Sequence, residues 1–260
     1  MNQRKIFNSI FVPGIFNQRK FLVTGATSGI GEETSKVLSE LGAKLILVGR
    51  DISKLENLKK IIGEKHFFIQ LDLSEDDSIY KTIKSLPADL LPLDGAFHSS
   101  GSEFIKPLNI IKAKDLYNSI SNSSAVALSI GRAAANKKCF KDSSSIVFMS
   151  SISSKFGAEG MTVYSSSKGC IDSMVKSMSI ELSKRKIRFN SINAAAVETP
   201  MHKKVIKNMS KEAILNYEKK HPLGFGSTKD ISNLVVFLLS DASSWITGTS
   251  VIIDGGYSAV

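Results

Sequence analysis

Tyr164 and Lys168 stand four residues apart, and Ser151 precedes the tyrosine by thirteen residues. Side chains four apart on a helix lie on one face, so this spacing would place an ammonium group one turn from a phenol. Such a cation favours the phenolate, and we expect it to lower the tyrosine pKa from about 10 towards neutrality. The phenol could then give or take a proton, while Ser151 hydrogen-bonds the same substrate oxygen. By itself the pattern is more typical of an exposed helical pair, so its meaning depends on the surrounding elements.

A glycine-rich turn near the start of the chain supplies that context. Residues 21–23 are a short apolar run that predicts a buried strand, and residues 32–41 have the pattern of a helix. Gly25, Gly29 and Gly31 lie between them. Glycines let the backbone approach a pyrophosphate closely, and the helix N-terminus offers N–H groups and a positive dipole end. The order of strand, turn and helix therefore indicates a phosphate-binding unit, with a tight turn that binds nothing as the alternative.

Composition bounds the class of protein. The 260 residues suit one α/β domain, and 42% hydrophobic with 22% charged residues is ordinary for a globular protein. The two cysteines and four histidines show no metal-type spacing, so we expect no metal site and a reducing, cytoplasmic compartment. The formal net charge of +10 is spread along the chain. We interpret it as solvated surface with some attraction for a phosphorylated cofactor, and we expect no nucleic-acid partner.

No apolar stretch reaches the length needed to span a bilayer, and we expect no membrane partner. Residues 1–18 lack the continuous apolar core of a secretory signal. They are predicted to be a lead-in segment that packs its phenylalanines on the edge of the domain, which covers residues 19–260.

The remainder of the chain alternates apolar runs with helical patterns. This alternation predicts an α/β fold with a doubly wound, mostly parallel seven-stranded sheet in a single domain. Ligands of such sheets bind beyond the carboxyl ends of the strands, and Ser151 follows such an end. The predicted strands cover residues 21–23, 44–49, 66–71, 93–98, 145–149, 188–192 and 250–253, and the predicted helices cover residues 32–41, 52–62, 76–85, 113–136, 163–184 and 234–240.

Taken together, these motifs resemble those of the short-chain dehydrogenase/reductase family, in particular its members of about 250 residues similar to 3-oxoacyl-carrier-protein reductases. The resemblance runs from about Arg19 to the C-terminus. The motifs that carry it are Thr24-Gly25-x-x-x-Gly29-x-Gly31, then Ser151 with Tyr164 and Lys168, then Thr247-Gly248 and Asp254-Gly255-Gly256. It implies a Rossmann fold, a nicotinamide cofactor and hydride exchange at a carbonyl or alcohol carbon.

The resemblance also implies roles for the catalytic residues. Tyr164 would be the general acid in reduction and the base in oxidation. Lys168 would lower its pKa and bind the nicotinamide ribose, and Ser151 would orient the substrate oxygen. Asn122 stands where the family has an asparagine that holds a proton-relay water, with a helix-surface asparagine as the alternative.

Cofactor preference follows from the second strand, which ends at Val48-Gly49-Arg50 without a carboxylate. Arg50 can pair with a 2′-phosphate, and Asp51 is placed to cap the next helix, so we expect NADP(H) to be preferred, with NAD(H) possible. Asp72 resembles the family's adenine contact, with a turn cap as the alternative. The predicted cofactor-binding residues are Gly25, Ser28, Gly29, Ile30, Gly31, Arg50, Asp72, Leu73, Ser100, Gly101, Tyr164, Lys168, Val197 and Thr199.

Two loops depart from the family. His98-Ser99-Ser100-Gly101 replaces Asn-Asn-Ala-Gly after the fourth strand, and Ala194-Ala195 replaces Pro-Gly after the sixth. We expect His98 to be a structural hydrogen-bonding residue, and we expect the loss of Pro and Gly to alter the stiffness of a loop that lies over the nicotinamide.

Residues 194–226 read as a partly helical lid over a small carbonyl or alcohol substrate. A 3-oxoacyl thioester, a carbohydrate derivative or a nucleotide-linked compound would each suit it. A non-catalytic nucleotide-binding scaffold or sensor, and a sugar-nucleotide epimerase or dehydratase, remain alternatives. The resemblance further implies a homotetramer or homodimer.

Overall fold

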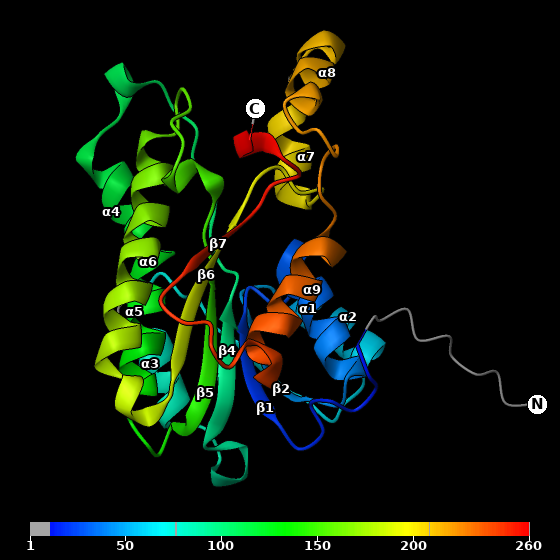
Figure 1. Ribbon diagram of the computed structural model, residues 1–260, viewed down its shortest axis with the longest axis vertical. Coiled ribbons are helices and arrows are strands. Elements are labelled where there is room, and N and C mark those ends of the chain that lie inside the picture. The colour runs from blue at the N-terminus through cyan, green and yellow to red at the C-terminus, as the bar shows by residue number, and fades with distance from the viewer. Residues whose placement is uncertain (1–10, 76, 208, 260) are drawn as a thin grey trace, which may run out of the picture.

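In the computed structural model the chain folds into a parallel β-sheet with helices on both faces (Figure 1). The structure describes residues 11–75, 77–207 and 209–259. The strands are β1 Lys20–Thr24, β2 Lys44–Gly49, β3 Phe67–Gln70, β4 Leu93–His98, β5 Phe140–Met149, β6 Arg188–Ala194 and β7 Ser250–Ile253. The α-helices of the described residues are α1 Gly29–Glu40, α2 Ile52–Ile62, α3 Ser78–Lys84, α4 Ala113–Ser121, α5 Ser124–Ala134, α6 Thr162–Glu181, α7 Pro200–Ile206, α8 Lys211–Lys219 and α9 Thr228–Leu239.

The strand order is β3-β2-β1-β4-β5-β6-β7, and each of these neighbouring pairs is parallel. The chain runs outward from β1 to β3, returns to place β4 beside β1, and then runs outward again. The predicted single-domain, doubly wound seven-stranded fold is confirmed. The order reverses between β1 and β4, and the loops that leave the carboxyl ends of these two strands flank the place where such sheets bind ligands.

Two hydrophobic clusters hold the layers together. Leu22 of β1 faces a cluster with side chains from α3, α5 and α6, whereas Phe21 and Val23 face a cluster with side chains from α1, α2 and α9. The alternation of buried residues along β1 thus serves both faces of the sheet, which is why the strand reads as a continuous apolar run. Each fully buried aliphatic side chain stabilises the fold by about 1.5–3 kcal/mol.

The prediction of one long helix over residues 113–136 is wrong, because the helix is interrupted between α4 and α5. Asn122 closes α4, and Ser123 leaves helical geometry with φ −135° and ψ −79°. Polar side chains compete for the backbone here: the Asn122 amide donates to the Asn118 carbonyl at 2.9 Å, and the Ser124 hydroxyl donates to the Ser167 carbonyl at 2.6 Å. The break turns Ser123 towards α6.

The element boundaries that differ most from the expected ones are the starts of β5 and α9. β5 begins at Phe140 rather than at residue 145, across an irregularity in its register with β4. α9 begins at Thr228, where Ser227 and Asp230 form a reciprocal capping box. In both cases the polar residues at the start of the element hide it from a pattern of apolar residues.

Of the predicted lead-in segment, residues 1–10 lie outside the described residues. Phe16 is buried, its N–H donates to the Leu41 carbonyl at 3.1 Å, and its ring meets Phe21 edge-on with centroids 5.0 Å apart. This part of the segment therefore packs on the domain. None of the helices in the described ranges combines the length and the apolar character that crossing a membrane requires.

Candidate active site

Ser151, Tyr164 and Lys168 are brought together by the end of β5 and the start of α6. Ser151 caps a short 3₁₀ turn, and its Oγ accepts from the Ser153 N–H at 3.2 Å. Lys168 Nζ donates to the Met149 carbonyl at 2.9 Å, which ties α6 to the last residue of β5. The same ammonium lies 5.7 Å from the centroid of the Tyr164 ring. The helical spacing read from the sequence thus places phenol, ammonium and hydroxyl at one carboxyl end of the sheet.

The electrostatics of this trio differ from the expectation. Burial, together with the charge of the Glu103 carboxylate, raises the pKa of Tyr164 to about 12, against the opposing effect of a hydrogen bond with Ser151. Burial also lowers the pKa of Lys168 to about 8, against the pull of Asp172. The predicted lowering of the tyrosine pKa by Lys168 is therefore not found in this structure. Tyr164 holds its proton at neutral pH, which suits a proton donor.

The side chain of Asn122 does not point to Lys168 but is engaged within its own helix. Its amide bonds back to its own helix, as the surface alternative expects. Ser123 instead turns inward, is buried, and accepts a hydrogen bond from Lys168 Nζ at 3.3 Å. The role of Asn122 in holding a proton-relay water stays a prediction, and Ser123 was not foreseen because the sequence pattern took α4 and α5 for one continuous helix.

His98 is a buried structural residue, as expected. The Thr24 hydroxyl pairs with His98 Nδ1 at 2.7 Å, and His98 Nε2 donates to the Ser123 carbonyl at 3.1 Å. Burial, with the charge of Lys168, lowers the pKa of His98 to about 3, so the ring is neutral. It links β1, β4 and the α4–α5 break, and so positions Ser123 beside Lys168.

The glycine-rich loop between β1 and α1 is built so that no side chain fits. A Cβ on Gly31 would lie 2.2 Å from the Gly25 carbonyl oxygen, and a Cβ on Gly25, whose φ is +69°, would lie 2.8 Å from the Ser100 nitrogen. α1 begins at Gly29 without a side-chain cap from Ser28, and the N–H groups of its first turn have no acceptor within the helix. These open donors and bare glycines fit the pyrophosphate of a dinucleotide.

The strand ends next to this loop carry the other predicted cofactor contacts. Arg50 follows β2 and is exposed, and Asp51 accepts from the Lys54 N–H at 3.1 Å, which confirms it as the cap of α2. Asp72 accepts from both the N–H and the hydroxyl of Ser74, at 2.9 and 2.8 Å. Its carboxylate is thus engaged in a turn, and the predicted adenine contact stays a prediction.

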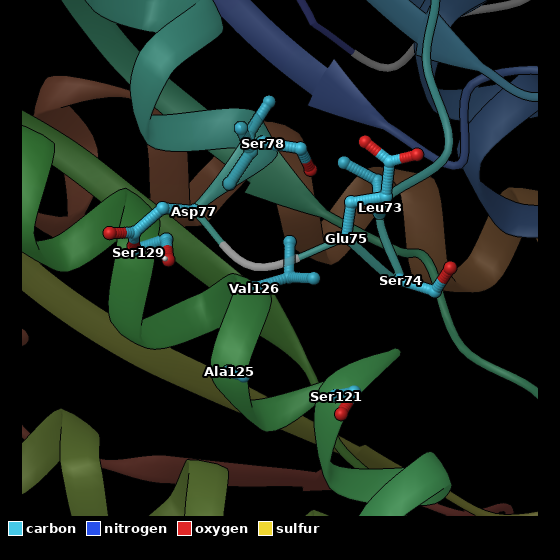
Figure 2. Close-up of a pocket in the computed structure, with 10 residues that line it drawn as sticks. Leu73, Ser74, Glu75, Asp77, Ser78, Ser121, Ala125, Val126 and Ser129 are labelled. Atoms are coloured by element: carbon cyan, nitrogen blue, oxygen red, sulfur yellow. Dashed lines mark hydrogen bonds between the residues drawn. The ribbon is translucent and has the colours of Figure 1, made fainter.

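A small pocket opens beside Leu73. Figure 2 shows it between the chain that follows β3 and the helices α4 and α5, with Ser121, Ala125 and Val126 on the helical side. Ser151, Tyr164 and Lys168 are not among the residues that line it. Of the two residues predicted to contact adenine, Leu73 lines this pocket and Asp72 does not.

The loop after β6 has backbone ties in place of the expected Pro-Gly. The Glu198 N–H donates to the Gly226 carbonyl at 2.8 Å, and the Gly226 N–H donates to the Ala196 carbonyl at 3.0 Å. Thr199 caps α7 by accepting from the His202 N–H at 3.1 Å, and its side chain contacts the position of Gly29. Thr199 is therefore held next to the glycine-rich loop, and Val197 is tied to Gly226 by a parallel β-bridge.

The predicted lid contains α7 and α8, which stand beyond the carboxyl edge of the sheet (Figure 1). Its base is an aromatic cluster. The buried His221 ring lies 5.3 Å from Tyr217, 5.2 Å from Phe225 and 4.9 Å from Tyr257, and the His202 ring lies 4.7 Å from Phe225. Tyr217 packs within this cluster, and burial, together with the charge of Glu103, raises its pKa to about 12.

Two residues close to Tyr164 and Lys168 were missed from the sequence, Ser123 and Glu103, whereas Tyr217 lies within the predicted lid. Glu103 could have been noticed in the sequence only as an acidic residue that follows the unusual segment His98–Gly101. Within the described ranges, no cluster of His, Cys, Asp or Glu could hold a metal ion, and Cys139 and Cys170 are unpaired.

Comparison with known proteins decides the family. Residues 25–258 match a family model described as Enoyl-(Acyl carrier protein) reductase. The chain is 30% identical over 246 residues to L-xylulose reductase of Bos taurus, an alignment that covers 93% of this chain and 97% of that one. The chain belongs to the short-chain dehydrogenase/reductase family. It is accordingly an NAD(P)-dependent oxidoreductase of that family.

Other members of the family are similar at comparable levels. Carbonyl reductase [NADPH] 2 of Sus scrofa is 30% identical, over 94% of this chain and 98% of that one. The 3-oxoacyl-[acyl-carrier-protein] reductase of Thermotoga maritima is 29% identical, over 90% and 96%. A solved structure of a short-chain dehydrogenase/reductase, glucose/ribitol dehydrogenase, from Brucella melitensis superposes with a TM-score of 0.87 at 26% identity, over 95% of this chain and 99% of that one.

Proposed function

We propose that this protein is an NADP(H)-dependent oxidoreductase that interconverts a carbonyl and a secondary alcohol, with Tyr164 as general acid and base. The observation that carries the proposal is the meeting of Ser151, Tyr164 and Lys168 at the carboxyl end of β5, next to a glycine-rich loop that accepts no side chain. A bound nicotinamide would supply or accept the hydride, and the chain's own residues position the substrate and move the proton.

Each residue has a distinct task in this proposal. Ser151 holds the substrate oxygen towards the phenol. Tyr164, whose pKa of about 12 keeps it protonated, gives its proton to that oxygen in the reducing direction. Lys168 stabilises the phenolate that remains, and Ser123 and the Met149 carbonyl fix the position of its ammonium. In the oxidising direction the same groups run in reverse.

A preference for NADP(H) is supported by Arg50. It is exposed directly after β2, where a guanidinium can pair with a 2′-phosphate. The nearest carboxylate, Asp51, is occupied in capping α2. The relative from Sus scrofa is named for NADPH.

A small hydroxylated or acyl-linked carbonyl compound is the proposed substrate. The names of the relatives span a ketose reductase and a 3-oxoacyl-carrier reductase, and both act at a carbonyl group.

The unpaired cysteines support a cytoplasmic location, because free thiols are typical of reducing compartments.

Homo-oligomer formation is proposed from exposed apolar side chains on two faces. Tyr117 of α4 and Leu128 of α5 are exposed on one, and Trp245 and Ile252, before and within β7, are exposed on the other. Light scattering in solution tests it: a mass of two or four chains supports the proposal, and a monomer at micromolar concentration contradicts it.

Turnover of a panel of ketones, aldehydes and secondary alcohols tests the proposed activity, with NADPH or NADH oxidation or NADP⁺ or NAD⁺ reduction followed by absorbance. Turnover with higher kcat/KM for NADPH is the expected result. Tight NADPH binding without any turnover would favour a scaffold or sensor instead. Conversion of a nucleotide sugar without net change in the cofactor would favour an epimerase or dehydratase.

A further inference from the structure

Glu103 is a half-buried carboxylate that has no hydrogen-bond or ion-pair partner among the residues that the structure describes. The cation nearest in sequence, Lys106, is already paired with Asp115 at 2.9 Å. A carboxylate withdrawn from water is costly unless a donor or a cation compensates it. The described residues supply neither a hydrogen-bond donor nor a cation to Glu103. A bound ligand could supply the donor if Glu103 lies close to the reacting groups.

The segment that carries Glu103 is held alongside Tyr164 at both of its ends. A Cβ on Gly101 would lie 3.3 Å from Lys168 Nζ, so the start of the segment lies against the catalytic lysine. The Lys106 N–H donates to the Gly160 carbonyl at 2.9 Å, so its end lies against the chain that enters α6. Tyr164 stands midway between Gly160 and Lys168, and Glu103 stands between the two anchors.

Two tyrosines from different elements respond to the charge of Glu103. Its carboxylate contributes to the raised pKa of Tyr164 on α6 and of Tyr217 on α8. Burial raises the pKa of Glu103 itself. The Glu103 carboxylate therefore lies close enough to both phenols for its charge to act on them, and its segment is anchored beside Lys168 and beside the chain that enters α6.

We propose that Glu103 is a substrate-binding residue that accepts a hydrogen bond from a hydroxyl group next to the reacting carbon. It repels substrates that carry a carboxylate or phosphate in that place. The substrate class is thus that of neutral α-hydroxyketones and the matching diols. This inference rests on the proposed oxidoreductase function and narrows it, since it assigns the group beside the carbonyl.

The exposed lysines of the lid do not supply the missing partner. Lys203 and Lys204 of α7 lie at the surface and form no ion pair with Glu103. The charges of Lys203 and Lys204 are therefore on the outer surface of the lid, whereas the negative charge of Glu103 acts on Tyr164. An anionic group of a substrate would suit the outer rim of the site but not the position next to the carbonyl.

Three ketones with the same acetyl end test the proposal: hydroxyacetone has a hydroxyl beside the carbonyl, 2,3-butanedione has a neutral group without a donor, and pyruvate has a carboxylate. Their kcat/KM values are measured with NADPH for the wild type, Glu103→Gln and Glu103→Leu. Glu159→Gln is the matched control, because it removes the same charge from an exposed site close to α6. NADPH dissociation constants are measured for every variant to show that the cofactor site is intact.

In Glu103→Gln we expect the kcat/KM for pyruvate to rise about tenfold, because the repulsion is gone. In Glu103→Leu we expect the value for hydroxyacetone to fall at least about tenfold and that for 2,3-butanedione to change less than about twofold. Glu159→Gln should leave all three values unchanged.

Equal changes for the three ketones in the Glu103 variants, with turnover retained, would overturn this inference and leave the proposed function standing. A wild type that prefers pyruvate to hydroxyacetone would overturn it as well. Absence of turnover with every ketone of the wider panel, despite normal NADPH binding, would overturn the proposed function and this inference with it.

Discussion

Two loops leave the carboxyl ends of neighbouring strands β1 and β4, and they are built in opposite ways. The loop after β1 is made of backbone: Gly25 and Gly31 leave no room for a Cβ, and the N–H groups of α1 are its binding groups. The chain at and after the end of β4 acts through side chains: His98 is bonded to Thr24 and the Ser123 carbonyl, and the charge of Glu103 acts on Tyr164. They touch where Gly25 meets Ser100.

The difference separates what the site shares with its family from what is particular to this chain. A loop whose function depends on close backbone approach tolerates few sequences, because an added Cβ collides with the main chain. A loop that acts through side chains can change residue by residue while the strands beneath it stay fixed. We therefore interpret the β1 loop as the common cofactor half and the β4 loop as the half that selects the substrate.

Tyr164→Phe gives the largest expected effect and tests whether chemistry and cofactor binding are separable. The substitution removes only the hydroxyl that moves the proton, so kcat should fall by about 10²–10⁴-fold while the NADPH dissociation constant stays within about twofold. Steady-state kinetics and fluorescence titration of NADPH measure the two quantities. Retained turnover would refute the role of Tyr164.

Gly31→Ala breaks the backbone loop. The new Cβ would lie 2.2 Å from the Gly25 carbonyl, so the loop must shift and NADPH affinity should fall at least about tenfold, with a stability loss of about 1–3 kcal/mol. Gly157→Ala is the control, because a Cβ there meets nothing within 4 Å. Calorimetric titration and urea unfolding report the changes. Normal affinity in Gly31→Ala would contradict the steric account.

Much of the cofactor half could be predicted from the sequence, because its signals are local. The glycine spacing, the apolar strands and the cap at Asp51 each lie within a few residues, and the structure has them where they were expected. The break at Ser123 and the electrostatic effect of Glu103 on Tyr164 and Tyr217 depend on segments far apart in the chain. The pKa of Tyr164 was mispredicted for the same reason, since burial and the charge of Glu103 raise it.

Arg50→Ser sharpens the cofactor side of the comparison. Loss of a charged hydrogen-bond donor to the 2′-phosphate should lower kcat/KM for NADPH by roughly 10–100-fold and leave the value for NADH nearly unchanged. Lys54→Ser removes the same charge from the next helix and should change neither. Equal losses with both cofactors would count against the phosphate contact of Arg50.

His98→Asn gives the smallest expected effect, in the pH dependence of stability. The pKa of His98 is about 3 in the folded state and about 6.5 unfolded, so the unfolded state binds the proton first and stability falls as pH drops from about 6.5 towards 3. In the variant, unfolding should take up one proton fewer in this range. The slope of the free energy of unfolding against pH should therefore be smaller by about 1.4 kcal/mol per pH unit between pH 6 and 4.5. Urea unfolding at several pH values measures it, and an unchanged slope would show that His98 is protonated in the fold.

Transfer of an isotope tests the central claim most directly. The protein is incubated with a ketone substrate and NADPH that carries deuterium at C4 of the nicotinamide, on each face in turn, and the alcohol product is analysed by mass spectrometry and NMR. The account predicts deuterium on the carbinol carbon from one face and none from the other. A product without deuterium from either face, or one that takes its carbon-bound hydrogen from solvent, would contradict it.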